Sequence, residues 1–159
     1  MVKFYEGLGE ELSLYVRYMA WLHTAPISTE KRSLDSAEPI SRLAKMEKDG
    51  IIPMFPPNSA PHLVNYLMEI GPIEAAGMDG APIGWATMRY WQDQMAIELQ
   101  PWEARLIRRL SAEYLTQSIK ARKPDCPAPW GQMTADDRDA ISAKIRSVFG
   151  GLAKNKIAA

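Results

Sequence analysis

The sequence predicts a mainly α-helical protein, a small multi-helix bundle of short helices separated by prolines. Apolar residues recur at steps of three and four through most of the chain, which is the period of a helix face, and no alternating strand pattern of convincing length occurs. Twelve prolines divide the 159 residues into short segments, because proline starts or ends helices and is excluded from central strands. A hydrophobic content of 47%, with five Trp and six Tyr, is enough for a folded core.

The first predicted helix begins near Leu8 and ends at Ala25-Pro26. It carries two adjacent apolar faces, and this width predicts burial on two sides. The first face consists of Leu8, Leu12, Tyr15, Met19 and Leu22, and the second of Leu14, Tyr18 and Trp21.

A second helix is expected to end at Asp49-Gly50, with Ser28 or Ser36 as its N-cap. Most of its residues are polar, so we expect it to be exposed to solvent. The segment 51–61 follows with four prolines in eleven residues, which is typical of an extended connector. It is the best candidate for a domain boundary.

The third predicted helix, 61–70, is entered through Asn58 or Ser59 and ends at Gly71-Pro72. A fourth helix covers about residues 84–98 and has a wide aromatic face. That face consists of Trp85, Met88, Trp91 and Met95.

The fifth predicted helix, from Pro101 to Lys123, has the most regular pattern in the chain. Proline costs little at a first helical position, because that N–H has no intrahelical partner, and Glu103 suits the positive end of the helix dipole. After a proline-rich connector, a last helix is expected from Thr134, where Asp137 completes a start that resembles a capping box. The apolar stripe of the fifth helix consists of Trp102, Leu106, Leu110 and Tyr114.

These elements suggest three regions: 1–57, an N-terminal helical region of unknown role; 58–123, a helical module; and 124–159, a proline-rich connector with a C-terminal helix. The single cysteine, Cys126, excludes an intramolecular disulfide and a thiolate metal site. The N-terminus does not resemble a signal peptide, and no apolar run is long enough to cross a bilayer. We therefore expect a cytoplasmic protein with no membrane partner.

The sequence offers no recognisable active site, and we expect no enzyme activity, catalytic residue, cofactor or metal. The phosphate-binding glycine motifs and the zinc-protease and hydrolase motifs are absent. The two histidines, His23 and His62, are far apart in the sequence and are better explained by structural roles. Cys126 has no neighbouring base that would activate its thiol. An enzyme built from scattered acidic residues is kept as a third hypothesis.

Tryptophan and arginine residues near the fourth and fifth helices are the best candidates for a partner-binding surface, because these residue types most often anchor protein interfaces. We expect Trp91 and Arg105 to be surface anchors. For Trp102 the alternative is a position in the core, since it is in phase with the apolar stripe of its helix. The candidate partner-binding residues are Trp85, Trp91, Trp102, Arg105 and Arg109.

The stretch Gly84–Lys123 is locally positive, with seven basic and four acidic residues. Its two helices are compatible with a helix-turn-helix in which Arg105, Arg108 and Arg109 face phosphates. A recognition helix normally begins with polar side chains that contact base edges, whereas this one begins with proline and tryptophan. A small helical DNA-binding regulator that uses helix 101–123 is therefore the alternative function, and nucleic acid is the less favoured partner.

One succession of motifs runs from His62 to Arg122. An apolar helix and a glycine-rich loop are followed by Pro-Ile-x-Trp, a hydrophobic-x-Leu step, Pro-Trp-Glu and Leu-Ser-x-x-Tyr-Leu. The motif residues are Pro82, Ile83 and Trp85; Ile97 and Leu99; Pro101, Trp102 and Glu103; and Leu110, Ser111, Tyr114 and Leu115. This pattern, over about sixty of the 159 residues, resembles the C-terminal module of tail assembly chaperones from long-tailed phages and prophages.

The resemblance implies a non-enzymatic protein that transiently binds the tape-measure protein, the tail tube protein or both during tail morphogenesis. It also implies that the protein acts in the host cell cytoplasm and is absent from the mature virion. Self-association is compatible with it. The resemblance leaves open whether the protein assists or interferes with tail assembly.

Overall fold

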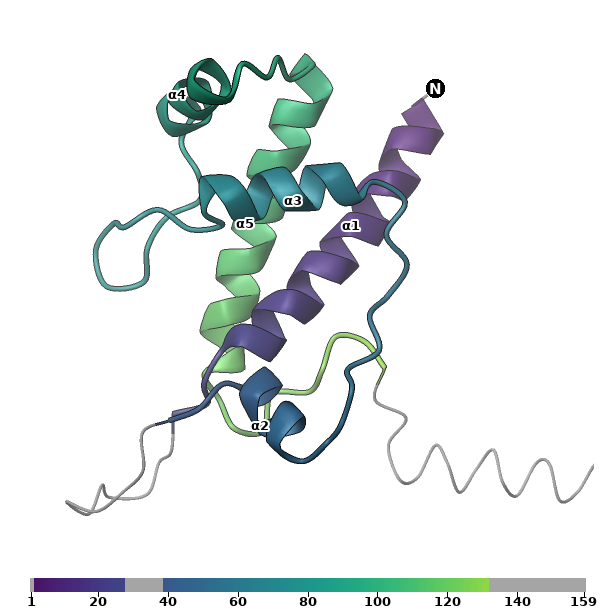
Figure 1. Ribbon diagram of the computed structural model, residues 1–159, viewed down its shortest axis with the longest axis vertical. Coiled ribbons are helices and arrows are strands. Elements are labelled where there is room, and N and C mark those ends of the chain that lie inside the picture. The colour runs from purple at the N-terminus through teal and green to yellow at the C-terminus, as the bar shows by residue number, and fades with distance from the viewer. Residues whose placement is uncertain (1, 28–38, 132–159) are drawn as a thin grey trace, which may run out of the picture.

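The computed structural model describes residues 2–27 and 39–131, which form five helices joined by loops (Figure 1). Within these residues the only β pairing is a single antiparallel bridge between Glu74 and Ala81. The predicted mainly helical bundle is therefore confirmed, although the first and fifth helices, with 22 and 21 residues, are long rather than short. None of the helices described is long and apolar enough to span a bilayer. The helices are α1 (Val2–His23), α2 (Arg42–Lys48), α3 (Pro61–Ile70), α4 (Trp85–Met95) and α5 (Pro101–Ala121).

The bundle is built on α1 and α5, which make the most extensive contact between helices. Figure 1 shows that the two helices run in the same general direction, with α3 lying across α5 and with α2 at the C-terminal end of α1. α4 lies beside α3, near the N-terminal end of α5 (Figure 1). Both faces of α1 are used, as its two apolar faces predict.

One main core joins α1 to the helices that follow the proline-rich connector. The predicted boundary at residues 57 and 58 therefore does not separate two hydrophobic cores, because side chains from both sides of it pack together. The fully buried members are Leu12, Val16 and Ala20 from α1; Leu63 and Leu67 from α3; Ile83 from the loop before α4; and Ile107 and Leu110 from α5.

A second, smaller cluster lies where α1 and α5 end, and α2 covers it. Leu43 and Met46 of α2 pack there against Tyr18 and Trp21 of α1. The expectation that the second helix is exposed to solvent is therefore confirmed for its outer face, where Ala44, Lys45, Glu47 and Lys48 are exposed, but not for the face that packs on this cluster. Its N-cap is Ser41, whose Oγ accepts a hydrogen bond from the Ala44 N–H at 3.2 Å. The expected caps Ser28 and Ser36 lie outside the described residues, as does the helix expected from Thr134.

Arg42, the first residue of α2, holds the ends of α1 and α5 together. It is 8% exposed, and its guanidinium carbon lies 4.7 Å from the ring centroid of Trp21. It donates hydrogen bonds to the carbonyl oxygens of Ala121 at 2.7 Å and Lys123 at 2.9 Å, and longer ones to those of Trp21 and Thr24. The C-termini of two helices carry partial negative charges side by side here, so one buried cation stabilises both.

The helix ends follow the sequence closely at two prolines and depart from it elsewhere. Pro61 and Pro101 begin α3 and α5 as predicted, and Glu103 accepts a hydrogen bond from the Gln100 N–H at 2.7 Å in a capping box. α4 ends at Met95, three residues earlier than expected, because Ala96 adopts a left-handed conformation with a φ of 51°.

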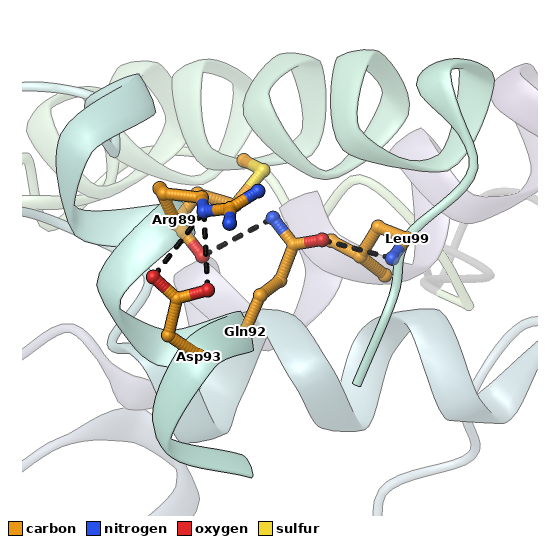
Figure 2. Close-up of polar contacts among 5 residues, drawn as sticks. Arg89, Gln92, Asp93 and Leu99 are labelled. Carbon is orange, nitrogen blue, oxygen red and sulfur yellow. Dashed lines mark hydrogen bonds and ion pairs between the residues drawn. The ribbon is translucent and has the colours of Figure 1, made fainter. Parts of the chain in front are cut away.

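The turn that follows α4 is tied to the helix by one glutamine (Figure 2). Gln92 accepts a hydrogen bond from the Leu99 N–H at 2.8 Å, while its side-chain amide donates to the Met88 carbonyl at 3.4 Å. This bridge brings the buried Leu99 back to the core and sets the direction in which α5 starts.

Candidate partner-binding site

The structure buries one of the candidate tryptophans and exposes another. Trp91 is only 9% exposed, and its ring centroid lies 5.1 Å from that of Tyr66 on α3, so the expectation that Trp91 is a surface anchor is wrong. The apolar stripe of α4 is longer than the surface that covers it. Its middle residues, Met88 and Trp91, are buried, while its two end residues, Trp85 and Met95, are 55% and 48% exposed.

Trp102 takes the alternative position that its phase in the apolar stripe of α5 suggests. It is partly buried and packs against the main core. Of the three candidate tryptophans, Trp85 is therefore the one whose ring is mostly exposed.

Trp85 and the outer face of α5 line an open depression, which we call the Trp85 depression. Trp85 comes from the first turn of α4, and the α5 residues are spaced by three, one and three positions, so that they share one helix face. Arg105 and Arg109 are among the expected partner-binding residues, whereas Arg108 is expected only in the alternative DNA-binding role. The guanidinium carbon of Arg108 lies 5.4 Å from the centroid of the Trp85 ring, within the range of a cation–π contact. The lining residues are Trp85, Arg105, Arg108, Arg109 and Ala112.

The charges of the Trp85 depression are only partly compensated. Arg109 forms an ion pair with Glu10 of α1, and this contact lowers the pKa of the Glu10 carboxyl from its ordinary value. Arg105 and Arg108 are exposed, and neither has a carboxylate partner within the described ranges 2–27 and 39–131. Two unpaired positive charges thus stand beside an exposed indole ring.

A buried serine fixes the loop that carries Trp85. Ser111 of α5 is fully buried; its Oγ accepts a hydrogen bond from the Ile83 N–H at 2.8 Å and donates one to the Pro72 carbonyl at 2.7 Å. Both ends of the loop between α3 and α4 are therefore attached to α5. The only signal in the sequence that points to Ser111 is its place in the Leu-Ser-x-x-Tyr-Leu motif.

Replacing Ser111 by alanine is expected to lower the free energy of unfolding by about 1–2 kcal/mol, because the buried Ile83 N–H and Pro72 carbonyl both lose their partner. Urea unfolding followed by circular dichroism measures this change. Thr116→Ala is the matched control, since that exposed hydroxyl bonds only to the Ala112 carbonyl of its own helix. Equal effects of the two variants would contradict the role of Ser111.

Glu74 fixes the first turn of α4 from the other side. Its Oε1 accepts a hydrogen bond from the Gly84 N–H at 2.7 Å, at the positive end of the helix dipole. Hydrogen bonds from the Thr87 side chain and from this backbone N–H lower the pKa of the Glu74 carboxyl. The residue next to Gly84 is Trp85, so Glu74 helps to set the direction of the exposed ring.

Glu74→Gln is expected to lower stability at neutral pH, and the loss should shrink in acid. Because the pKa of Glu74 in the folded protein lies below its ordinary value of 4.5, its carboxylate stabilises the fold fully above that value. This stabilisation is lost as the pH falls through the folded pKa. The measurement is the difference in free energy of unfolding between wild type and variant from about pH 7 to about pH 3. Glu69→Gln, at an exposed position on α3, is the control. A pH-independent difference for Glu74→Gln would show that the Glu74 carboxylate does not stabilise the fold.

The histidines and the cysteine are engaged within the fold. His23 Nδ1 lies 3.3 Å from the Tyr114 hydroxyl, and His62 Nε2 lies 4.0 Å from Glu103 Oε1. Cys126 accepts a hydrogen bond from the Trp21 indole N–H through its carbonyl oxygen at 2.9 Å. Among the residues with described positions, no three His, Cys, Asp or Glu side chains cluster as metal ligands would.

A second depression lies at the C-terminal end of α4, where Figure 2 shows that the side chains of Arg89, Gln92 and Asp93 are already paired. Arg89 forms an ion pair with Asp93 at 3.1 Å, and Gln92 bridges to Leu99 as described above. This depression has fewer free groups to offer a partner than the Trp85 depression.

Comparison with known proteins finds no matching family model, no matching curated protein and no matching solved structure.

Proposed function

We propose that this protein is a non-enzymatic, tail assembly chaperone-like protein that transiently binds the tape-measure protein, the tail tube protein or both, through the Trp85 depression. The observation that carries the proposal is the exposure of Trp85, a residue that is 55% exposed beside two arginines without a carboxylate partner in the described residues. Tryptophan and arginine together are the side chains that most often contribute the energy of a protein interface.

Trp85 differs in exposure from most of the motif residues that resemble the chaperone family, and this difference supports the proposal. Five of them are buried, and folding alone explains why their side chains are apolar or hydrogen-bonded. Trp85 belongs to the same motifs but is left mostly exposed, so the fold does not explain its large apolar ring. A partner that covers the ring does. The five buried residues are Ile83, Leu99, Leu110, Ser111 and Tyr114.

The alternative, DNA binding through helix 101–123, has less support from the arrangement of α5. One face of this helix is buried against α1 and α3, so it is not free to enter a groove on that side. Arg109 and Arg122 are paired with Glu10 and Asp79, which removes part of the positive charge that phosphates would need.

A tagged pull-down tests the proposal. The full chain is expressed with the surrounding phage or prophage genes, captured at low and at high salt, and the bound proteins are identified by mass spectrometry. Retention of tape-measure or tube protein at high salt is the expected result, because salt screens the charges of the arginines but does not weaken the burial of the Trp85 ring. Recovery of nucleic acid alone, removed by salt, would instead favour the regulator.

The proposed function also states where and when the protein acts. The protein acts in the host cytoplasm while the tail is assembled, and it is absent from the mature virion. Western blots of purified virions and of infected-cell lysates check this, with signal expected in the lysates only.

A further inference from the structure

We infer that the Trp85 depression binds an acidic segment of the partner, in which carboxylates flank an apolar side chain that rests on Trp85. This inference rests on the proposed function, since it names the chemistry of the partner segment at the same site.

The positive charges of the Trp85 depression favour binding of carboxylates. Arg109 is already neutralised by Glu10, which leaves Arg105 and Arg108 three positions apart on the exposed face of α5. Neither has an acidic partner in the part of the chain that the structure describes. A guanidinium binds a carboxylate through two parallel hydrogen bonds. It is also more weakly hydrated than an ammonium group, so removing its water on binding costs less free energy. A partner with two nearby carboxylates therefore complements both arginines.

The apolar part of the Trp85 depression calls for an apolar side chain between those carboxylates. Arg108 lies over the Trp85 ring, and Ala112 adds a small apolar surface beside it. An apolar group that covers the exposed part of the ring also removes water from the neighbouring arginines. The attraction between opposite charges is stronger where water is excluded.

The distribution of basic residues along α5 favours an acidic peptide over a nucleic acid. The next basic residue after Arg109 is Lys120, eleven positions later, which is about 16 Å along the helix axis. Arg122 at that end is paired with Asp79. The unpaired charge is thus concentrated at one small site, whereas a duplex is bound through a row of phosphate contacts.

A photo-crosslinking experiment with the full chain identifies what lies on the site. Trp85→p-benzoylphenylalanine places a reactive aromatic ketone in the Trp85 depression, and Tyr90→p-benzoylphenylalanine is the control on the same helix, at a position that is 73% exposed but outside the depression. The expected crosslink from position 85 is to a peptide with at least two Asp or Glu residues beside the linked apolar residue. A neutral or basic peptide, a nucleic acid or no crosslink would overturn the inference.

The same crosslink separates this inference from the proposed function. An acidic peptide from a protein other than the tape-measure or tube protein supports the acidic chemistry and contradicts the chaperone proposal. A neutral peptide from the tape-measure protein supports the chaperone proposal and contradicts the acidic chemistry.

Charge reversal measures how much the two arginines contribute to the affinity for the partner. Arg105→Glu and Arg108→Glu are each expected to weaken binding of the crosslinked partner by about 10-fold or more, because like charges then face each other. Lys120→Glu makes the same charge change at an exposed position outside the Trp85 depression, and it should change the affinity by less than about 2-fold. Circular dichroism confirms that each variant is folded. An equal loss in all three variants would show that only net charge matters and would overturn the inference.

Discussion

Replacing Arg42 by methionine is expected to lower the free energy of unfolding by about 3 kcal/mol, the largest effect we expect from a single change on α2. Methionine keeps an apolar side chain against Trp21 but removes the guanidinium donor of the Ala121 carbonyl and one of the two donors of the Lys123 carbonyl, which retains the Cys126 N–H. It also removes the one buried cation at the joined C-terminal ends of α1 and α5. Urea unfolding at neutral pH, followed by circular dichroism and tryptophan fluorescence, measures the loss.

Two variants show whether the hydrogen bonds of Arg42 or its charge alone are responsible. Arg42→Lys keeps the charge but cannot donate to several carbonyls at once, so an intermediate loss is expected. Lys45→Met removes an exposed positive charge from the same helix and should change stability by less than about 0.5 kcal/mol. If Arg42→Met were no more harmful than Lys45→Met, the role assigned to Arg42 would be wrong.

Replacing Trp85 by alanine is expected to weaken partner binding by about 100-fold while leaving the fold intact. The exposed part of the ring offers on the order of 130 Å² for burial, which corresponds to about 3 kcal/mol. Stability should fall only slightly, because more than half of the residue faces solvent and its cation–π contact with Arg108 lies at the surface. Calorimetric titration of the purified chain with the captured partner measures the affinity.

Tyr90→Ala is the matched control for Trp85→Ala. Tyr90 is also aromatic, is also on α4 and is 73% exposed, but it does not line the Trp85 depression. Its removal should change the affinity by less than about 3-fold. Equal losses in the two variants would mean that α4 binds through a broad apolar surface and not through the Trp85 depression.

The elements that can be predicted best from the sequence are those whose signals are local. Pro61 and Pro101 are the first residues of α3 and α5, because proline suits the first position of a helix but not its interior. The apolar steps of α5 identify its buried face correctly, since a residue every three or four positions must lie on one side.

Features that depend on distant contacts cannot be predicted in this way. The partners of Arg42 are carbonyls at residues 21, 24, 121 and 123, and no local pattern reveals them, so the sequence of α2 does not predict that this arginine is buried. The stripe of α4 likewise gives no sign of which part is covered, and for this reason the expected exposure of Trp91 is wrong. The proline-rich segment 51–61 resembles a linker between domains, yet it connects two parts of one core.

Binding at Trp85 is tested by ¹⁹F NMR of the full chain labelled with 5-fluorotryptophan, with and without the partner captured in the pull-down. The five tryptophans give five signals, which single Trp→Phe variants assign. We expect the Trp85 signal to shift and to lose its solvent isotope effect when the partner binds, while the buried Trp91 signal stays unchanged. Binding that leaves the Trp85 signal as it is in the free protein would show that the partner does not bind at the Trp85 depression.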